Sequence, residues 1–153
     1  SFGQSFQLSP IRLLTTISAV INGGNMITPH FGVKILDEQM NRKYTIRYNA
    51  QKNVISKDTS EVMKKILESV VSEGGGKKAA VDGYKVGAKT GTSEKLPRRS
   101  GKYGASCMGF APADNPKVIA LVLIDEPQGI YYGGTIAAPV ISKLLDDILP
   151  YID

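Results

Sequence analysis

The sequence has very few of the residues that hold metals or form cross-links. Among 153 residues it contains one cysteine, one histidine and no tryptophan. One cysteine cannot close an intramolecular disulfide, and a single Cys–His pair does not supply the usual ligands of a zinc site. We therefore predict neither a metal nor a cofactor. Cys107 is interpreted as a buried, inert thiol and His30 as a structural residue in a turn.

Long apolar runs are absent as well. No stretch reaches the ~18 apolar residues that a membrane-spanning helix requires, so no part of this sequence is predicted to cross a bilayer. The opening residues, SFGQSFQLSP, have neither the basic start nor the apolar segment of a signal peptide. If the protein acts outside the cytoplasm, its export signal or membrane anchor is expected outside this chain.

Positive charge exceeds negative charge only modestly. The formal net charge is +5, from 19 Lys and Arg against 14 Asp and Glu, and part of the excess lies between Lys95 and Lys102. The aromatic residues that a single-strand binder interleaves with its basic residues are missing there, so we predict no nucleic-acid partner. The basic segment is interpreted as a solvated loop, with contact to an anionic substrate as the alternative.

Two segments have helical signatures with both ends marked. In the first, Ser9 can cap the helix, apolar residues follow at helical spacing, and Gly23 and Gly24 supply a left-handed end. The second helix begins at Ser56 or Asp58, either of which can cap it, and three consecutive glycines end it.

The rest of the chain predicts strands and a closing helix. That helix is expected from about Thr135 to Leu149, and Pro139 is tolerable only in its first turn. The strand candidates are residues 83–95, 103–113 and 117–127, with two short strands around a polar turn within 32–49.

The order of these elements predicts the fold class. The short turn PADNPK makes the last two main strands an antiparallel hairpin. Antiparallel strands with helices against one face form an α+β layer. No repeat, low-complexity tract or linker divides the chain, so residues 1–153 are expected to form one domain.

The segment Lys89-Thr90-Gly91-Thr92 carries the clearest chemical pattern. On a strand, residues two apart lie on one side, so both threonine hydroxyls can bind a carboxylate beside the charge of Lys89. Gly91 lets a ligand lie along the strand, and the Thr92 N–H is available to stabilise an oxyanion. The motif is short, however, and a strand end with a solvated lysine is the alternative.

The context of this motif resembles a known family, the penicillin-binding transpeptidases, and specifically their class B, monofunctional branch. The resemblance covers nearly the whole chain and involves five blocks in the family's order. These are GQSFQLSPIRLLTTISAVINGGNMITPH, VISKDTSEVMKKILESVVSEGGGKKA, YKVGAKTGTSEK with the third motif of the family, ASCMGFAPADNPKVIALVLIDEP, and YYGGTIAAPVISKLLDDIL.

The resemblance implies acyl transfer on the D-alanyl-D-alanine end of a peptidoglycan stem peptide, by a serine that β-lactams also acylate. Lys89 would support the proton relay electrostatically, and Thr90 and Thr92 would bind the terminal carboxylate. The Thr92 N–H would form half of the oxyanion hole, and Gly91 would let the substrate approach. The implied location is the extracytoplasmic face of a bacterial membrane.

Two further motifs of the family are missing. No serine has lysine three residues later or asparagine two residues later, so the nucleophile, its base and half of the oxyanion hole are absent. The chain therefore resembles the C-terminal half of a transpeptidase domain, whose N-terminal half is an expected partner. We expect the isolated chain to be unreactive toward β-lactams.

Such a half-domain is expected to expose apolar surface or an unpaired strand edge, and to self-associate. Tyr131 and Tyr132, in a Gly-rich link, are expected either to line the binding groove or to pack. Two other classes remain open. One is a serine β-lactamase-like hydrolase or sensor, which shares the Lys-Thr-Gly motif. The other is a non-catalytic module that binds anions or peptidoglycan.

Overall fold

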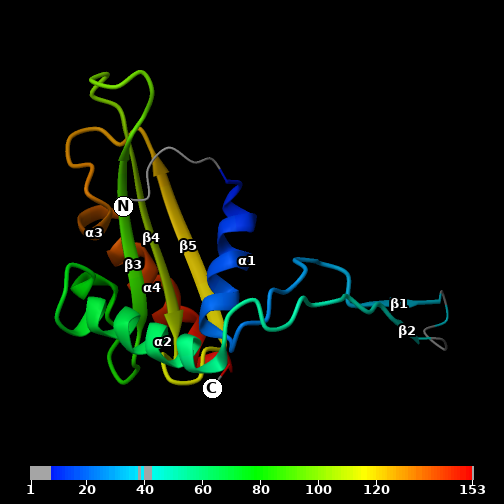
Figure 1. Cartoon of the computed structure of the whole chain (residues 1–153). Coiled ribbons are helices and arrows are strands. Elements are labelled where there is room, and N and C mark those ends of the chain that lie inside the picture. Colours follow the sequence, from blue (N-terminus) through cyan, green and yellow to red (C-terminus); the bar gives the residue numbers. More distant parts are fainter. Residues whose placement is uncertain (1–7, 38, 40–42, 153) are drawn as a thin grey trace.

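An antiparallel sheet with helices packed on it forms the body of the protein (Figure 1). The computed structural model describes residues 8–37, 39 and 43–152. The fold class predicted from the sequence, α+β, is confirmed. The elements are α1 (Pro10–Ile21), β1 (Lys34–Leu36), β2 (Lys43–Thr45), α2 (Lys57–Ser72), the 3-10 helix η1 (Lys77–Ala79), β3 (Gly87–Glu94), β4 (Tyr103–Ala111), β5 (Val118–Asp125), α3 (Gly133–Ile136) and α4 (Ala138–Ile152).

The predicted helix ends have the expected geometry. The Ser9 hydroxyl caps α1, accepting a hydrogen bond from the Arg12 N–H at 3.4 Å. After α1, Gly23 and Gly24 have φ of 80° and 87°, a left-handed conformation that favours glycine. Of the two residues that could cap α2, the structure uses Ser56, whose hydroxyl accepts from a backbone N–H in the first turn at 3.0 Å.

The main sheet has the order β3-β4-β5, and all three predicted strands are present. Both pairings are antiparallel, with Gly87 opposite Phe110 and Phe110 opposite Ile119. Because side chains alternate between the two faces, Phe110 and its neighbour Gly109 point to opposite sides. The turn between β4 and β5 closes the predicted hairpin.

Helices cover both faces of this sheet, so the expectation of helices against one face is wrong. On one face α4 lies against Gly109, where an added Cβ would meet Ile141 at 2.4 Å. On the other face Phe110 packs with Ile21 of α1 and Leu67 of α2. Near Gly109 and Phe110 the strands carry apolar residues on both faces of the sheet. Each face must therefore be buried by a helix of its own.

The closing helix differs from its prediction at both ends. The chain makes the short helix α3 first, bends, and then begins α4, so Pro139 lies in the first turn of α4 as predicted. α4 continues through Pro150 to its end at Ile152, although the sequence predicted an end at Leu149. Proline in the last turn removes one backbone donor, while Leu149 remains buried in the core.

Strands β1 and β2 form a separate two-stranded arm that projects from the body (Figure 1). They pair antiparallel, with Ile35 opposite Tyr44, which confirms the two short strands expected within residues 32–49. Part of the connecting turn lies outside the described residues. Near the base of the arm, Phe31 is fully exposed, at 105%.

Candidate functional site

The strand that carries the Lys-Thr-Gly-Thr motif is an edge strand. Within the described part of the chain, β3 pairs with β4 alone. The Lys95 N–H donates to the Lys102 carbonyl at 2.8 Å, which continues the β3–β4 register and marks that pair as hydrogen-bonded. Antiparallel pairs alternate between bonded and non-bonded, so Thr90 and Thr92 direct their N–H and C=O groups away from β4. The motif therefore presents backbone groups at an open edge.

Side chains of the motif lie on both faces of β3. Thr90 and Thr92 share one face, as the two-residue spacing predicts, and Lys89 and Gly91 are on the other. The exposed Lys89 ammonium donates to the carbonyl of Thr90 at 2.8 Å, across the strand edge. A Cβ added at Gly91 would lie 2.6 Å from the Ser106 hydroxyl oxygen, so the Ser106 side chain would have to turn away to admit it.

Helix α3 lies directly on the face that carries the threonines. The Gly133 N–H donates to the Thr92 hydroxyl oxygen at 3.1 Å. An added Cβ at Gly133 would meet the carbonyl oxygens of Gly91 and Ser106 at 2.3 Å, so only glycine allows this approach. The sequence predicted only a Gly-rich link here and did not predict this contact. The one available signal was the pair of glycines that begins α3.

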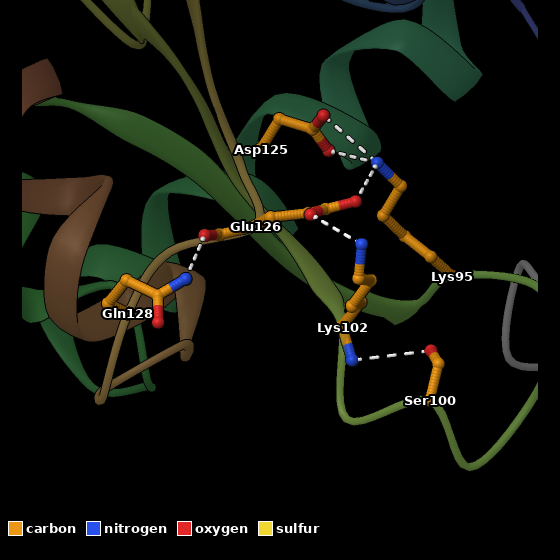
Figure 2. Close-up of polar contacts among 6 residues, drawn as sticks. All are labelled: Lys95, Ser100, Lys102, Asp125, Glu126 and Gln128. Atoms are coloured by element: carbon orange, nitrogen blue, oxygen red, sulfur yellow. Dashed lines mark hydrogen bonds and ion pairs between the residues drawn. The ribbon is translucent and has the colours of Figure 1, made fainter.

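The basic loop is tied to the end of β5 by ion pairs (Figure 2). The Lys95 ammonium lies 2.9 Å from Asp125 and 2.9 Å from Glu126, and Lys102 lies 3.0 Å from Glu126. Hydrogen bonds to Glu126 and Asp125 raise the pKa of Lys95, and those from Lys95 and Lys102 lower the pKa of Glu126. These contacts pair two of the loop's four cations with carboxylates.

Of the two tyrosines before α3, one packs against the sheet and the other is exposed. Tyr131 stacks on Tyr103 of β4, with ring centroids 4.0 Å apart and planes at 8°, so it packs. Tyr132 is 57% exposed, and its hydroxyl lies 3.4 Å from that of Tyr131. This stack places the chain beside the sheet just before Gly133.

Cys107 and His30 have the surroundings that the sequence suggested. Cys107 is fully buried, and burial raises the pKa of its thiol to about 11, so the thiolate is scarce at neutral pH. His30 donates to the Thr28 carbonyl at 2.7 Å and stacks on Tyr48. Among the described residues there is no cluster of His, Cys, Asp and Glu that could hold a metal ion.

Comparisons with known proteins place this geometry in a family. A family model of the penicillin-binding protein transpeptidase domain matches residues 1–146. The chain is 42% identical to stage V sporulation protein D of Bacillus subtilis, over 98% of this chain and 24% of that protein. It is 35% identical to the peptidoglycan D,D-transpeptidase FtsI of Buchnera aphidicola, over 97% of this chain and 25% of that protein.

A solved structure agrees with the sequence relatives. The TP domain of penicillin-binding protein 3 from Burkholderia pseudomallei superposes with a TM-score of 0.74 at 31% identity, over 95% of this chain and 43% of that one. The fold is thus that of a partial transpeptidase-like α+β domain. The chain belongs to the penicillin-binding protein transpeptidase-domain family, in its class B branch.

The match covers only part of the known proteins. The chain spans about a quarter of the length of the curated relatives it matches, at 24% and 25% for the two above. In the part of the chain that the structure describes, no helix combines the length and the apolar character needed to cross a membrane.

Proposed function

We propose that this chain supplies the substrate-binding strand of a serine D,D-transpeptidase that cross-links peptidoglycan stem peptides and is acylated by β-lactams. The open edge of β3 carries this proposal. There the Thr92 amide points away from the sheet, the Thr92 side chain is exposed, and the charge of Lys89 lies on the same strand. An extended peptide can pair with such an edge and place its terminal carboxylate beside these groups.

Each motif residue has a distinct proposed role. The Thr92 N–H forms half of the oxyanion hole, and the Thr90 and Thr92 hydroxyls bind the terminal carboxylate of D-Ala-D-Ala. Thr92 is more exposed than the half-buried Thr90, which supports Thr92 as the principal contact. Lys89 supports the proton relay by its charge, and Gly91 lets the substrate backbone lie close to the strand.

The nucleophile must come from another polypeptide segment, because no Ser-x-x-Lys or Ser-x-Asn occurs in this sequence. We propose that a further, N-terminal half of the domain supplies both motifs and that the complete protein acts outside the cytoplasmic membrane. The isolated chain is expected to form no stable adduct with a fluorescent penicillin. Stable labelling of one of its own serines would contradict this.

A graft tests the proposed function. The matching segment of the Bacillus subtilis relative is replaced by this chain, and labelling by a fluorescent penicillin is measured against the intact relative. The graft should label, and Lys89→Met should slow acylation by roughly 100-fold or more, since removing a charge aimed at the reacting centre costs that much. Lys85→Met, at an exposed lysine that precedes β3, is the matched control and should label normally.

The same graft separates the alternatives. A label that is bound and then rapidly released as hydrolysed drug would favour a β-lactamase-like hydrolase. A well-folded graft that never labels, or labels equally well with Lys89→Met, would reject a catalytic role for this strand. Binding of N-acetyl-D-alanyl-D-alanine by such an unreactive protein would favour a non-catalytic binding module.

We also propose that the isolated chain self-associates. The β3 edge is open, Leu123 on the sheet is 52% exposed, and the arm leaves Phe31 uncovered. Unpaired edges and exposed apolar side chains favour association with a second copy. Light scattering should give a mass above 16.5 kDa that rises with concentration. A constant monomer mass would argue against this.

A further inference from the structure

The Thr92 hydroxyl is held on one side by the main chain of a segment far along the sequence. The Gly133 N–H donates to its oxygen at 3.1 Å, across a separation of 41 residues. Thr92 itself is exposed at the open edge of β3. Thus one side of the hydroxyl faces a fixed donor, and the other side faces solvent.

The chemistry of this contact determines where the hydroxyl proton can point. A threonine hydroxyl has one proton and two lone pairs, and a backbone N–H can only donate. The bond from Gly133 therefore occupies one lone pair of Thr92, and the Thr92 proton cannot point at the Gly133 nitrogen. Accepting one hydrogen bond also strengthens a hydroxyl as a donor.

The position of Gly133 relative to β3 is fixed from several directions. Its Cα lies against the backbone where Gly91 pairs with Ser106, with no space for a side chain. Its carbonyl accepts a hydrogen bond from the Ala137 N–H at 2.9 Å. Two residues earlier, the Tyr131 ring stacks on Tyr103 of β4. The Gly133 amide is therefore a rigid donor rather than part of a loose loop.

We propose that Gly133 is a positioning residue, whose amide turns the Thr92 hydroxyl into an outward-pointing donor for the carboxylate of a bound peptide. This rests on the proposed function, and it adds α3 and its tyrosine stack to the site. A carboxylate suits this position because it only accepts hydrogen bonds, and because the ammonium of Lys89 lies on the same strand edge.

The orientation is tested first without ligand, on the full 153-residue chain labelled with ¹⁵N. Thr92→Val removes the acceptor and should speed hydrogen exchange of the Gly133 amide by roughly tenfold. Thr92→Ser restores the acceptor and should return exchange to the parent rate. Thr90→Val, on the same face of β3, is the matched control and should leave Gly133 unchanged.

The stack provides a second measurement. Tyr131→Phe keeps the ring on Tyr103 and should leave the Gly133 amide protected. Tyr131→Ala removes the ring and should speed hydrogen exchange of the Gly133 amide by several-fold. The reason is that an aromatic pair contributes more than simple burial. If neither Thr92→Val nor Tyr131→Ala changes the hydrogen-exchange rate of the Gly133 amide, the inference is overturned, whatever the chain binds.

Ligand binding is then measured by NMR with N-acetyl-D-alanyl-D-alanine, and with its C-terminal carboxamide as the uncharged counterpart. We expect Thr92→Ser to bind the carboxylate like the parent and Thr92→Val to bind it roughly tenfold more weakly, because charge-assisted hydrogen bonds are the stronger class. The carboxamide should bind weakly to all three proteins.

The two failures are distinguishable. If Gly133 responds to Thr92→Val but carboxylate affinity does not change, the inference is overturned while the proposed function survives. If Gly133 responds but the folded graft never labels with a fluorescent penicillin, the orientation of the hydroxyl is upheld and the proposed function fails.

Discussion

The two faces of the main sheet differ in how completely they are covered. On the α4 face, Ala105, Cys107 and Ala111 of β4 are at most 1% exposed, and Cys107 and Ala111 share a core cluster with buried side chains of α4. On the opposite face, α1 and α2 bury Phe110 at one end, while Leu123 near the other end is 52% exposed. The α4 face is covered by a buried core, whereas the opposite face is covered only at the end that holds Phe110.

The uncovered part of this face carries two of the four motif residues. Lys89 and Gly91 lie on this face, next to Ser106 of β4, and the strand pattern turns polar there. A surface that must bind a substrate cannot also be filled by the core of the same chain. The motif therefore spans both faces: Lys89 and Gly91 lie on the open part of this face, whereas Thr90 and Thr92 lie on the α4 face, where α3 contacts them.

Shortening a buried side chain of α4 should have the largest effect on stability. Leu145 is fully buried against the sheet, and Leu145→Ala should lower the free energy of unfolding by about 2–5 kcal/mol. Leu144→Ala makes the same change one residue earlier, at a side chain that is 38% exposed, and should cost less than about 1 kcal/mol. Urea denaturation measures both. Equal losses would mean that α4 does not close this face as described.

Adding a methyl group to β4 compares the two faces directly. Gly109→Ala places a Cβ 2.4 Å from Ile141, a β-branched side chain with little freedom to move, and should cost about 1–3 kcal/mol. Gly104→Ala adds the same group on the other face, where the nearest atom is 3.5 Å away, and should change stability by less than about 0.5 kcal/mol. Thermal unfolding of both variants checks the difference, and a reversed order would refute the assignment of the faces.

The smallest expected effect concerns the ion pairs at the edge of the site. The pKa of Glu126 is lowered, so its stabilising contribution is present above the usual value of 4.5 and is lost as pH falls through the folded-state pKa. The pKa of Lys95 is raised, so its contribution is present below 10.5 and is lost as pH rises through the folded-state pKa. Glu126→Gln should therefore flatten the acid side of the stability profile.

Salt provides the control for this prediction. Exposed ion pairs weaken at high ionic strength, so the difference between Glu126→Gln and the parent should shrink in concentrated NaCl. Denaturation midpoints at several pH values, with and without added salt, give the comparison. A difference that is independent of both pH and salt would show that the loop is not held by charge.

Local signals in the sequence were sufficient for most of the elements. Ser9 and the glycines after α1 mark a helix through backbone rules that act over a few residues. The alternation around Lys89 and Thr92 identifies a strand and the side of it that each residue occupies. The resemblance of five blocks to a known family added the candidate chemistry, because motif order carries more information than a short tripeptide.

Contacts between distant segments were beyond the reach of these signals. Nothing near Thr92 in the sequence indicates that Gly133 donates to its hydroxyl, and nothing near Lys95 indicates Glu126. The same holds for the cover on the second sheet face, which requires α1 and α2 to pack against strands far along the chain. Periodicity gives an apolar side to each element but does not name the element that will cover it.

The sequence alone was enough to predict the type of most elements, the strand that carries Lys89 to Thr92, and the absence of a Ser-x-x-Lys nucleophile, but not the two ends of the closing helix. The packing of distant elements was needed to show that this strand lies at an open edge, that its threonines face α3, and that the two sheet faces are covered unequally. Capping, turn chemistry and alternation are local, whereas edge position and burial depend on which elements meet. The candidate site therefore depends on how β3, β4 and α3 pack together.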